Sequence, residues 1–326
     1  MLLIEVNNLS QPLASSQCAS IKTYPEDWRV TEITDQSWSS EGEHAYIYVE
    51  KRGMNTAAVA AWLARCYQVK EMNVGFSGMK DKFAVTQQWF SVHSPLDLKS
   101  TDLALVDSSG SESAYAKALQ ITRHNKKLRR GEHTLNHFKI TLRDLAFSQE
   151  LNEDSLSALG TAFPNYFGLQ RFGLNNIESA LSWLKNRRNR KISRKARGWH
   201  FSVLRSLLFN KIAGARVAAG NVHEFIAGDA EEFSVPSGSL WGRGRSVLSA
   251  DALAIETHAL AEDAWVCEAL EFAGVDRAMR PLSVLPQNFS CAMLEDAVVE
   301  FEFALPPGAY ATVLLAQHFD IKDKSI

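Results

Sequence analysis

Two stretches of strict alternation between apolar and polar residues lie far apart in this chain and constrain how it folds. Residues 138–143 and residues 298–303 both place every second side chain, an apolar one, on one face, as half-buried β-strands do. The segment between them, about 150–280, is helical in pattern apart from a turn-rich stretch at 225–248. The simplest architecture is one domain made from both ends of the chain, with a second domain inserted in the middle. Periodicity alone leaves open whether the two ends meet.

Local patterns add strands and helices to this outline. A strand is predicted at 44–50 and another at 86–92, with a helix between them that begins at Asn55 or Thr56. Strand, helix and strand therefore build one α+β unit before residue 150. Further helices are predicted at 151–163, 177–186, 200–219, 258–273 and 310–319.

Composition sets limits on class and location. The chain has 326 residues, of which 46% are hydrophobic, so it can supply a core to each of two domains. No apolar run approaches the roughly 20 residues that span a bilayer, and the first residues lack the pattern of a secretory signal. We therefore expect a cytoplasmic protein without a membrane role. We expect no metal or disulfide framework, because the four cysteines are scattered without paired spacing: Cys18, Cys66, Cys267 and Cys291.

The distribution of charge is more informative than the net charge of −2. Residues 185–197 contain eight basic side chains and no acid, and residues 123–143 are a second basic concentration. The chain after Asp251 is comparatively acidic. Such a distribution favours a one-sided positive surface and a nucleic-acid partner. Either run alone is also compatible with a solvated loop.

Asp81 is the leading candidate for chemistry. It lies between Lys80 and Lys82, after a small-residue turn and before a strand-like run that ends near Phe90. Neighbouring lysines are expected to lower the pKa of the carboxyl group and keep it ionised. An ionised carboxylate acts as a nucleophile or stabilises a developing cation. The alternative is a solvated turn with no chemical role.

Four segments in the same order resemble the TruD family of tRNA pseudouridine synthases. The first is Pro-Glu-Asp-Trp-Arg-Val-Thr-Glu at 25–32, and the second is Gly-x-Lys-Asp-x-x-Ala-x-Thr-x-Gln at 78–88. The third is a basic run followed by Asn-His-Phe, at 123–138, and the fourth is Pro-Asn-Tyr-Phe-Gly-Leu-Gln-Arg-Phe-Gly at 164–173. A weaker match follows at 204–210. The resemblance covers the chain from about Pro25 onward.

This resemblance implies a fold and a division into domains. The family has an α+β fold, in which a pseudouridine-synthase catalytic domain with a mixed, mostly antiparallel sheet carries an inserted, family-specific domain. We therefore expect residues 1–150 and 281–326 to form the catalytic domain and residues 151–280 to form the inserted TRUD-type domain.

The resemblance also implies an activity and a site. The family isomerises uridine 13 of certain tRNAs to pseudouridine, with the aspartate that corresponds to Asp81 as catalytic carboxylate. Because no atom is gained or lost, no cofactor is expected, and tRNA is the implied partner with no protein partner evident. The implied substrate-binding residues are Trp28, Lys80, Asn136, Phe138, Arg171 and Tyr310. Trp28 and Tyr310 stand where the family usually has phenylalanine, and core packing is the alternative role for both and for Phe138.

Two other functions remain open at this stage. An RNA-binding or RNA-folding protein would use the same cleft without chemistry, although it would not need an acid between lysines. A glycosidic hydrolase normally employs two carboxylates, and the sequence shows no second acid near Asp81. An RNA labelled at C5 of uridine separates the three, because isomerisation releases the label, hydrolysis releases uracil, and binding releases neither.

Overall fold

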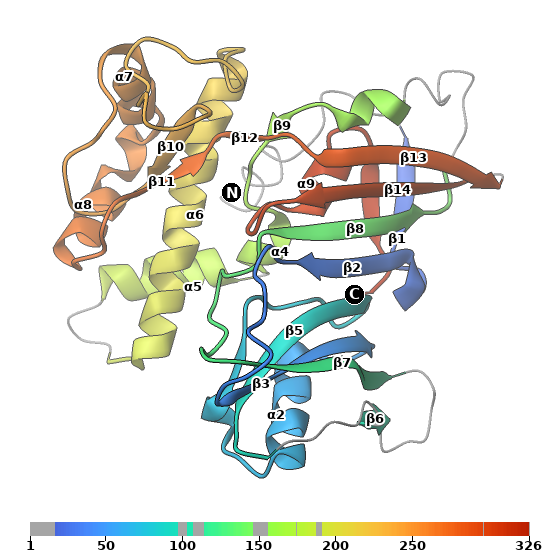
Figure 1. Ribbon diagram of the computed structural model, residues 1–326. Coiled ribbons are helices and arrows are strands. Elements are labelled where there is room, and N and C mark those ends of the chain that lie inside the picture. Colours follow the sequence, from blue (N-terminus) through green and yellow to red (C-terminus); the bar gives the residue numbers. More distant parts are fainter. Residues whose placement is uncertain are drawn as a thin grey trace. The chain divides into compact units, whose positions relative to one another are not determined.

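A computed structural model describes residues 17–96, 103–106, 114–145, 156–173, 175–186, 191–295 and 297–325. The chain divides into two compact units, which are described separately here (Figure 1). The sheet unit contains residues 17–160, 286–307 and 321–326, and the helical unit contains residues 161–285 and 308–320. Residues 281–285 and 308–320 thus belong to the helical unit, whereas the family resemblance implies that 281–326 as a whole belongs to the catalytic domain.

A nine-stranded sheet is the frame of the sheet unit. Its strand order is β13-β14-β8-β2-β5-β3-β7-β6, with β4 also paired to β5. All of these neighbours are antiparallel except β2 and β5, which are parallel, so the sheet is mixed and mostly antiparallel as expected. The strands are β2 (Trp28–Ile33), β3 (His44–Arg52), β4 (Val74–Phe76), β5 (Val85–His93), β6 (Ala104–Val106), β7 (Tyr115–His124), β8 (Leu135–Leu142), β13 (Gln287–Glu295) and β14 (Val298–Leu305).

The two alternating stretches of the sequence are neighbours in this sheet. Strand β14 pairs with β8, and Phe303 lies opposite Phe138 in the register. Phe301, Phe303 and Ile140 are fully buried. The apolar faces of two strands far apart in sequence therefore share one core, which answers the question that periodicity left open.

Helix α2 (Thr56–Cys66) covers part of one face of the sheet (Figure 1). Its Val59, Trp62 and Leu63 are spaced for one helical face, and all three are buried in a cluster with residues of β3, β5 and β7. The helix begins after Asn55, as the sequence predicts.

The short strand β1 (Cys18–Ile21) pairs with β15 (Asp320–Asp323). Ser20 and Arg143 exchange two backbone hydrogen bonds, at 2.7 and 2.9 Å, which fix β1 to the end of β8. The Lys324 N–H donates to Ile21 O at 3.0 Å. A single-turn 3₁₀ helix, η1 (Pro25–Asp27), then leads into β2.

The helical unit is built along α6 (Arg194–Ala218). The side-chain amide of Asn210 on this helix accepts from Phe167 N at 2.8 Å and donates to Phe167 O at 2.9 Å, which ties the 164–173 segment to α6. The other elements are α4 (Leu169–Phe172), α5 (Asn176–Lys185), α7 (Ala250–Ala259), α8 (Ala264–Phe272), α9 (Ala311–Leu315), β9 (Phe163–Pro164) paired with β12 (Ser283–Val284), and β10 (Ser237–Leu240) paired with β11 (Ala278–Pro281).

Four helix predictions differ from the structure, and one of them is the helix expected at 310–319, of which α9 covers only Ala311–Leu315. The helix expected at 258–273 is interrupted, because α7 ends at Ala259 and a 3₁₀ turn, η4 (Ala261–Asp263), separates it from α8. Helix formers on both sides hide this break from a periodicity scan. Of the helix expected at 151–163, residues 151–155 lie outside the described residues, and the C-terminal end is strand β9. Helix α6 begins six residues before the predicted start, after an N-cap in which Ser193 accepts from Ala196 N.

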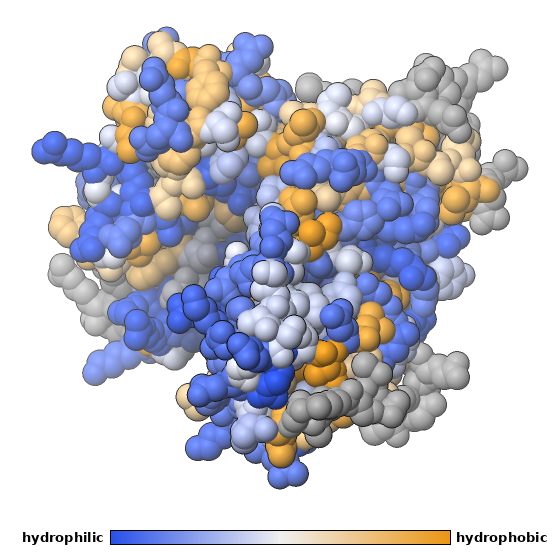
Figure 2. Space-filling view, in the orientation of Figure 1, coloured by the Kyte–Doolittle hydropathy of each residue, from blue (hydrophilic) through white to orange (hydrophobic). Residues whose placement is uncertain are grey.

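The surface is mixed in polarity. On the face seen in Figure 2, hydrophobic residues are interspersed with hydrophilic ones. Among the helices in the described part of the chain, none is both long and apolar enough to cross a membrane.

Candidate active site

Asp81 follows a loop, residues 77–80, whose backbone is held by side chains from the sheet and from α2. Gln88 Nε2 donates to Gly78 O at 3.0 Å. The Thr56 hydroxyl accepts from the Lys80 N–H at 2.9 Å. The loop is therefore fixed through its backbone as well as through its side chains.

The carboxylate of Asp81 forms an ion pair with Lys22. Lys22 Nζ lies 3.0 Å from Asp81 Oδ2, 3.7 Å from Asp323 Oδ2 and 4.7 Å from the centre of the Trp28 ring. The Asp81 side chain is 40% exposed, whereas that of Lys22 is 4% exposed. The carboxylate thus reaches solvent while the cation that holds it is buried.

Sequence reasoning missed Lys22 and expected the flanking lysines to act on Asp81. In the structure Lys82 is exposed, and the Lys80 amino group pairs with Glu32. Lys22 directly follows β1 and has a φ of 55°. A non-glycine residue in this left-handed region is uncommon and often marks a functional site. No signal in the sequence around Lys22 distinguishes it from a surface lysine.

Lys80 and Glu32 form a buried ion pair beneath the loop. Glu32, on β2, accepts from Ser77 Oγ at 2.6 Å, from Lys80 Nζ at 3.1 Å and from Trp89 N at 3.3 Å. Burial lowers the pKa of Lys80, and the charge of Glu32 opposes this effect. Glu32 is itself buried, with 4% of its surface exposed. The position of Lys80 favours a role in organising the loop over a contact with phosphate.

Asn136 and His133 complete this network. Asn136 Oδ1 accepts from Lys80 Nζ at 2.9 Å, so its amide nitrogen faces His133 Nε2 at 3.1 Å. His133 Nε2 must then accept, which assigns the proton to Nδ1. Burial lowers the pKa of His133, and the charge of Lys80 adds to this effect. A methyl group on Gly78 would lie 3.2 Å from both His133 Cε1 and Lys80 Nζ, so an alanine there would press on both side chains.

Lys51 is a second buried lysine that sequence reasoning missed. It lies on β3, is 1% exposed, and donates to Asp81 O at 2.6 Å. Burial lowers the pKa of Lys51 to about 8, against the opposing effect of the Asp81 charge. Lys22 and Lys51 therefore hold the side chain and the backbone of the same residue.

The candidate uracil platforms of the sheet unit are largely buried. Trp28 is 3% exposed and Phe138 is 8% exposed. Phe138 stacks on Phe303 with ring centres 5.6 Å apart, and the Trp28 ring meets it edge-on at 6.3 Å. Packing accounts for most of the surface of both rings.

Arg171 and Tyr310 lie in the helical unit. The Arg171 guanidinium lies 5.9 Å from the centre of the Phe167 ring, and the Tyr310 ring meets Phe167 edge-on at 6.1 Å. Burial lowers the pKa of the adjacent Arg280 to about 10 and raises that of Tyr310. Both predicted residues therefore belong to one aromatic and cationic cluster within that unit.

Comparison with known proteins supplies the family. The family model for tRNA pseudouridine synthase D (TruD) matches residues 14–181. A tRNA pseudouridine synthase D of Cellvibrio japonicus is 38% identical over 319 residues, which cover 94% of this chain and 91% of the relative. The chain belongs to the TruD family.

Other TruD proteins agree with this assignment. The tRNA pseudouridine synthase D of Methylococcus capsulatus is 38% identical, with 91% of this chain and 90% of the relative covered. A crystal structure of a TruD protein from Methanosarcina mazei superposes with a TM-score of 0.67 at 20% identity, and it covers 97% of this chain and 98% of that one. The expected α+β fold is thus confirmed.

We expect Lys51 to make the stability of this TruD chain rise with pH between about 8 and 10.5. An unfolded lysine titrates near 10.5 and the folded Lys51 near 8, so the unfolded chain binds more protons in this window. The full difference is worth about 3 kcal/mol. Lys51→Met should flatten this rise, whereas Lys82→Met, at an exposed lysine, should leave it unchanged.

Denaturant unfolding at several pH values below 10 measures this effect. Above pH 10 the buried Tyr46 and Tyr48, whose pKa values are raised to about 12, make stability fall with pH and would mask the trend. An identical slope in Lys51→Met and the wild type would show that burial does not lower the pKa of Lys51.

Proposed function

We propose that this chain converts a uridine of tRNA to pseudouridine, at position 13 by its resemblance to the family, with Asp81 as the catalytic carboxylate. The observation that carries the proposal is the difference in exposure between the Asp81 carboxylate and the lysines that hold it. Its carboxylate is 40% exposed, while Lys22 and Lys51, which hold its side chain and its backbone, are buried. A carboxylate held in place by a buried cation and still open to solvent suits attack on an electron-poor carbon.

The reaction balances without any other reactant. The bond between N1 and C1′ breaks, the uracil turns, and a bond between C5 and C1′ forms. C5 loses its hydrogen to solvent and N1 gains a proton. In the proposed role Asp81 acts at C1′ of a nucleotide that has left its stack, because the reacting bond is not accessible inside a helix.

We further propose that Trp28, Asn136 and Phe138 line the uracil pocket, with Lys80 as organiser of the loop. The exposed 8% of the Phe138 surface and the side-chain amide of Asn136 are the proposed contacts to the base. Arg171 and Tyr310 are proposed as substrate contacts from the helical unit.

The domain roles are part of the same proposal. Residues 1–150 and 281–326 are proposed as the catalytic domain and residues 151–280 as the inserted TRUD-type domain, with tRNA as the partner. A tRNA substrate also supports a cytoplasmic location. The names of the relatives favour this isomerase over an RNA-binding protein without chemistry.

We expect Asp81→Asn to abolish turnover while RNA affinity stays within about tenfold, roughly 1.4 kcal/mol. The amide preserves the shape of the side chain and loses the nucleophile. The assay is tritium release from a tRNA transcript labelled at C5 of uridine. Asp323→Asn is the matched control, because it also removes one negative charge near Lys22. Near wild-type release by Asp81→Asn would show that another group performs the chemistry, and free uracil would indicate hydrolysis.

Phe138→Leu should reduce the single-turnover rate much more than it reduces thermal stability. A ring that stacks on a base contributes about 1–3 kcal/mol, and leucine retains most of the apolar volume. Phe303→Leu is the matched control, because Phe303 is fully buried opposite Phe138 on β14. It should lower the melting temperature with a smaller effect on rate. If Phe138→Leu melts early and isomerises normally, Phe138 is a core residue and the platform is Trp28 or Tyr310.

A further inference from the structure

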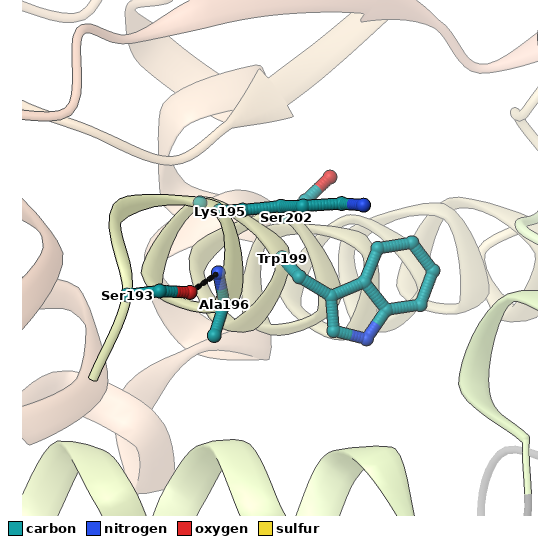
Figure 3. Close-up of a pocket in the computed structure, with 6 residues that line it drawn as sticks. Ser193, Lys195, Ala196, Trp199 and Ser202 are labelled. Atoms are coloured by element: carbon teal, nitrogen blue, oxygen red, sulfur yellow. Dashed lines mark hydrogen bonds between the residues drawn. The ribbon is translucent and has the colours of Figure 1, made fainter.

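The first two turns of α6 form an exposed surface that the proposed chemistry does not use. An open hollow of about 550 Å³ is lined by one stretch of this helix (Figure 3). The lining residues are Ser193, Lys195, Ala196, Gly198, Trp199 and Ser202.

The indole ring of Trp199 lines this hollow and is contacted by the guanidinium group of Arg171. Trp199 is 43% exposed, and the Arg171 guanidinium lies 4.8 Å from the centre of its ring. Arg171 is itself held by the hydroxyl groups of Ser202 and Ser206. A large aromatic side chain that is braced by a fixed cation and still open to solvent is a ready stacking platform.

The charged residues that precede Trp199 on α6 and in the segment before it are all positive. Lys195 and Trp199 extend in the same direction from α6 (Figure 3). Lys191, Arg194 and Arg197 are also exposed, and within the described ranges none of these four cations forms an ion pair. The sequence has no acidic residue from 185 to 223, although residues 187–190 lie outside the described ranges. The surface therefore complements a polyanion.

Gly198 gives an independent indication that this face is kept open. Glycine in the middle of a helix is less favourable than alanine. A methyl group at Gly198 would meet no atom within 4 Å, so packing does not require glycine there. Its φ is not in the left-handed region either. What the missing methyl does provide is bare helix backbone beside the indole, where a ligand can approach closely.

We propose that this surface binds one unpaired base of the RNA substrate, which stacks on Trp199 while an adjoining phosphate contacts Lys195. A single-stranded or flipped base offers the flat face that an indole accepts, and its phosphate offers the negative charge. The site is distinct from the uracil pocket proposed around Asp81. The inference rests on the proposed function in that it takes tRNA as the ligand.

The test measures the affinity of the full chain for an unmodified tRNA transcript, in an Asp81→Asn background that prevents turnover. Trp199→Ala should weaken binding about 5- to 150-fold with an unchanged slope of affinity against salt. Trp199→Phe should keep most of the affinity. Lys195→Gln should also weaken binding and should reduce the magnitude of the slope by about 0.7–0.9, as expected for one lost phosphate contact.

Trp265 provides the matched control. It is 39% exposed and has the Lys185 amino group 5.3 Å from its ring centre, but it lies among acidic residues of α8 and the preceding turn. Trp265→Ala should therefore bind RNA as the parent does. Equal weakening by Trp199→Ala and Trp265→Ala would overturn the assignment.

Gly198→Ala guards against a folding artefact. It should raise the melting temperature, because the added methyl is unobstructed and favours the helix, and yet it should weaken RNA binding. Affinity within twofold of the parent for both Trp199→Ala and Gly198→Ala would overturn the proposal. Tritium release by the wild type tests the proposed function separately. If the wild type releases tritium normally and both variants keep the parent affinity, only the stacking site is refuted.

Discussion

The fixed backbone of the loop at residues 77–80 is the constraint on which the site depends. A loop carries polar groups that lose water when the chain packs around them, and each must find a partner. Here Gln88 donates to the carbonyl oxygen of Gly78, and the hydroxyl group of Thr56 accepts from the Lys80 N–H. Lys51 donates to the carbonyl oxygen of Asp81. These three partners come from β5, α2 and β3. Because the loop is tied to separate elements, it can shift only if the sheet unit itself deforms.

The site also concentrates buried charge. Lys22, Lys51, Lys80 and Glu32 are each at most 8% exposed. Burying a charge is costly unless it is paired and hydrogen-bonded. Lys22, Lys80 and Glu32 each have a charged partner, and Lys51 has the carbonyl oxygen of Asp81. For three of the four groups, the partner belongs to the loop or to Asp81. The cost of desolvation is thus linked to the geometry of the site, since moving the loop would leave a charge without its counterpart.

The sequence motifs identified the candidate catalytic residue, but they did not identify the buried lysines that hold it in place. Asp81, Lys80 and Asn136 lie within segments that resemble the family, and the structure brings Lys80 and Asn136 into direct contact. Lys22 and Lys51 carry no comparable signal, because a buried lysine and a surface lysine look alike until the fold decides which one loses water. The two alternating strands could be predicted because an alternating apolar pattern is visible within a few consecutive residues. The burial of a lysine depends on the whole fold. Strand β13 was not predicted, because two irregularities in its register break the alternation.

The pairing of β1 with β15 has a consequence for how the protein is made. Roughly 300 residues separate these strands, so at about 5–20 residues per second the ribosome delivers β15 some 15–60 seconds after β1. Until then β1 lacks one neighbour, and Lys22 at its end lacks Asp323 and the hydrogen bond between Lys324 and Ile21. The loop that bears Asp81 can form early with the strands near it in sequence. The cation that pairs with its carboxylate gains its last contacts only when the far end of the chain arrives.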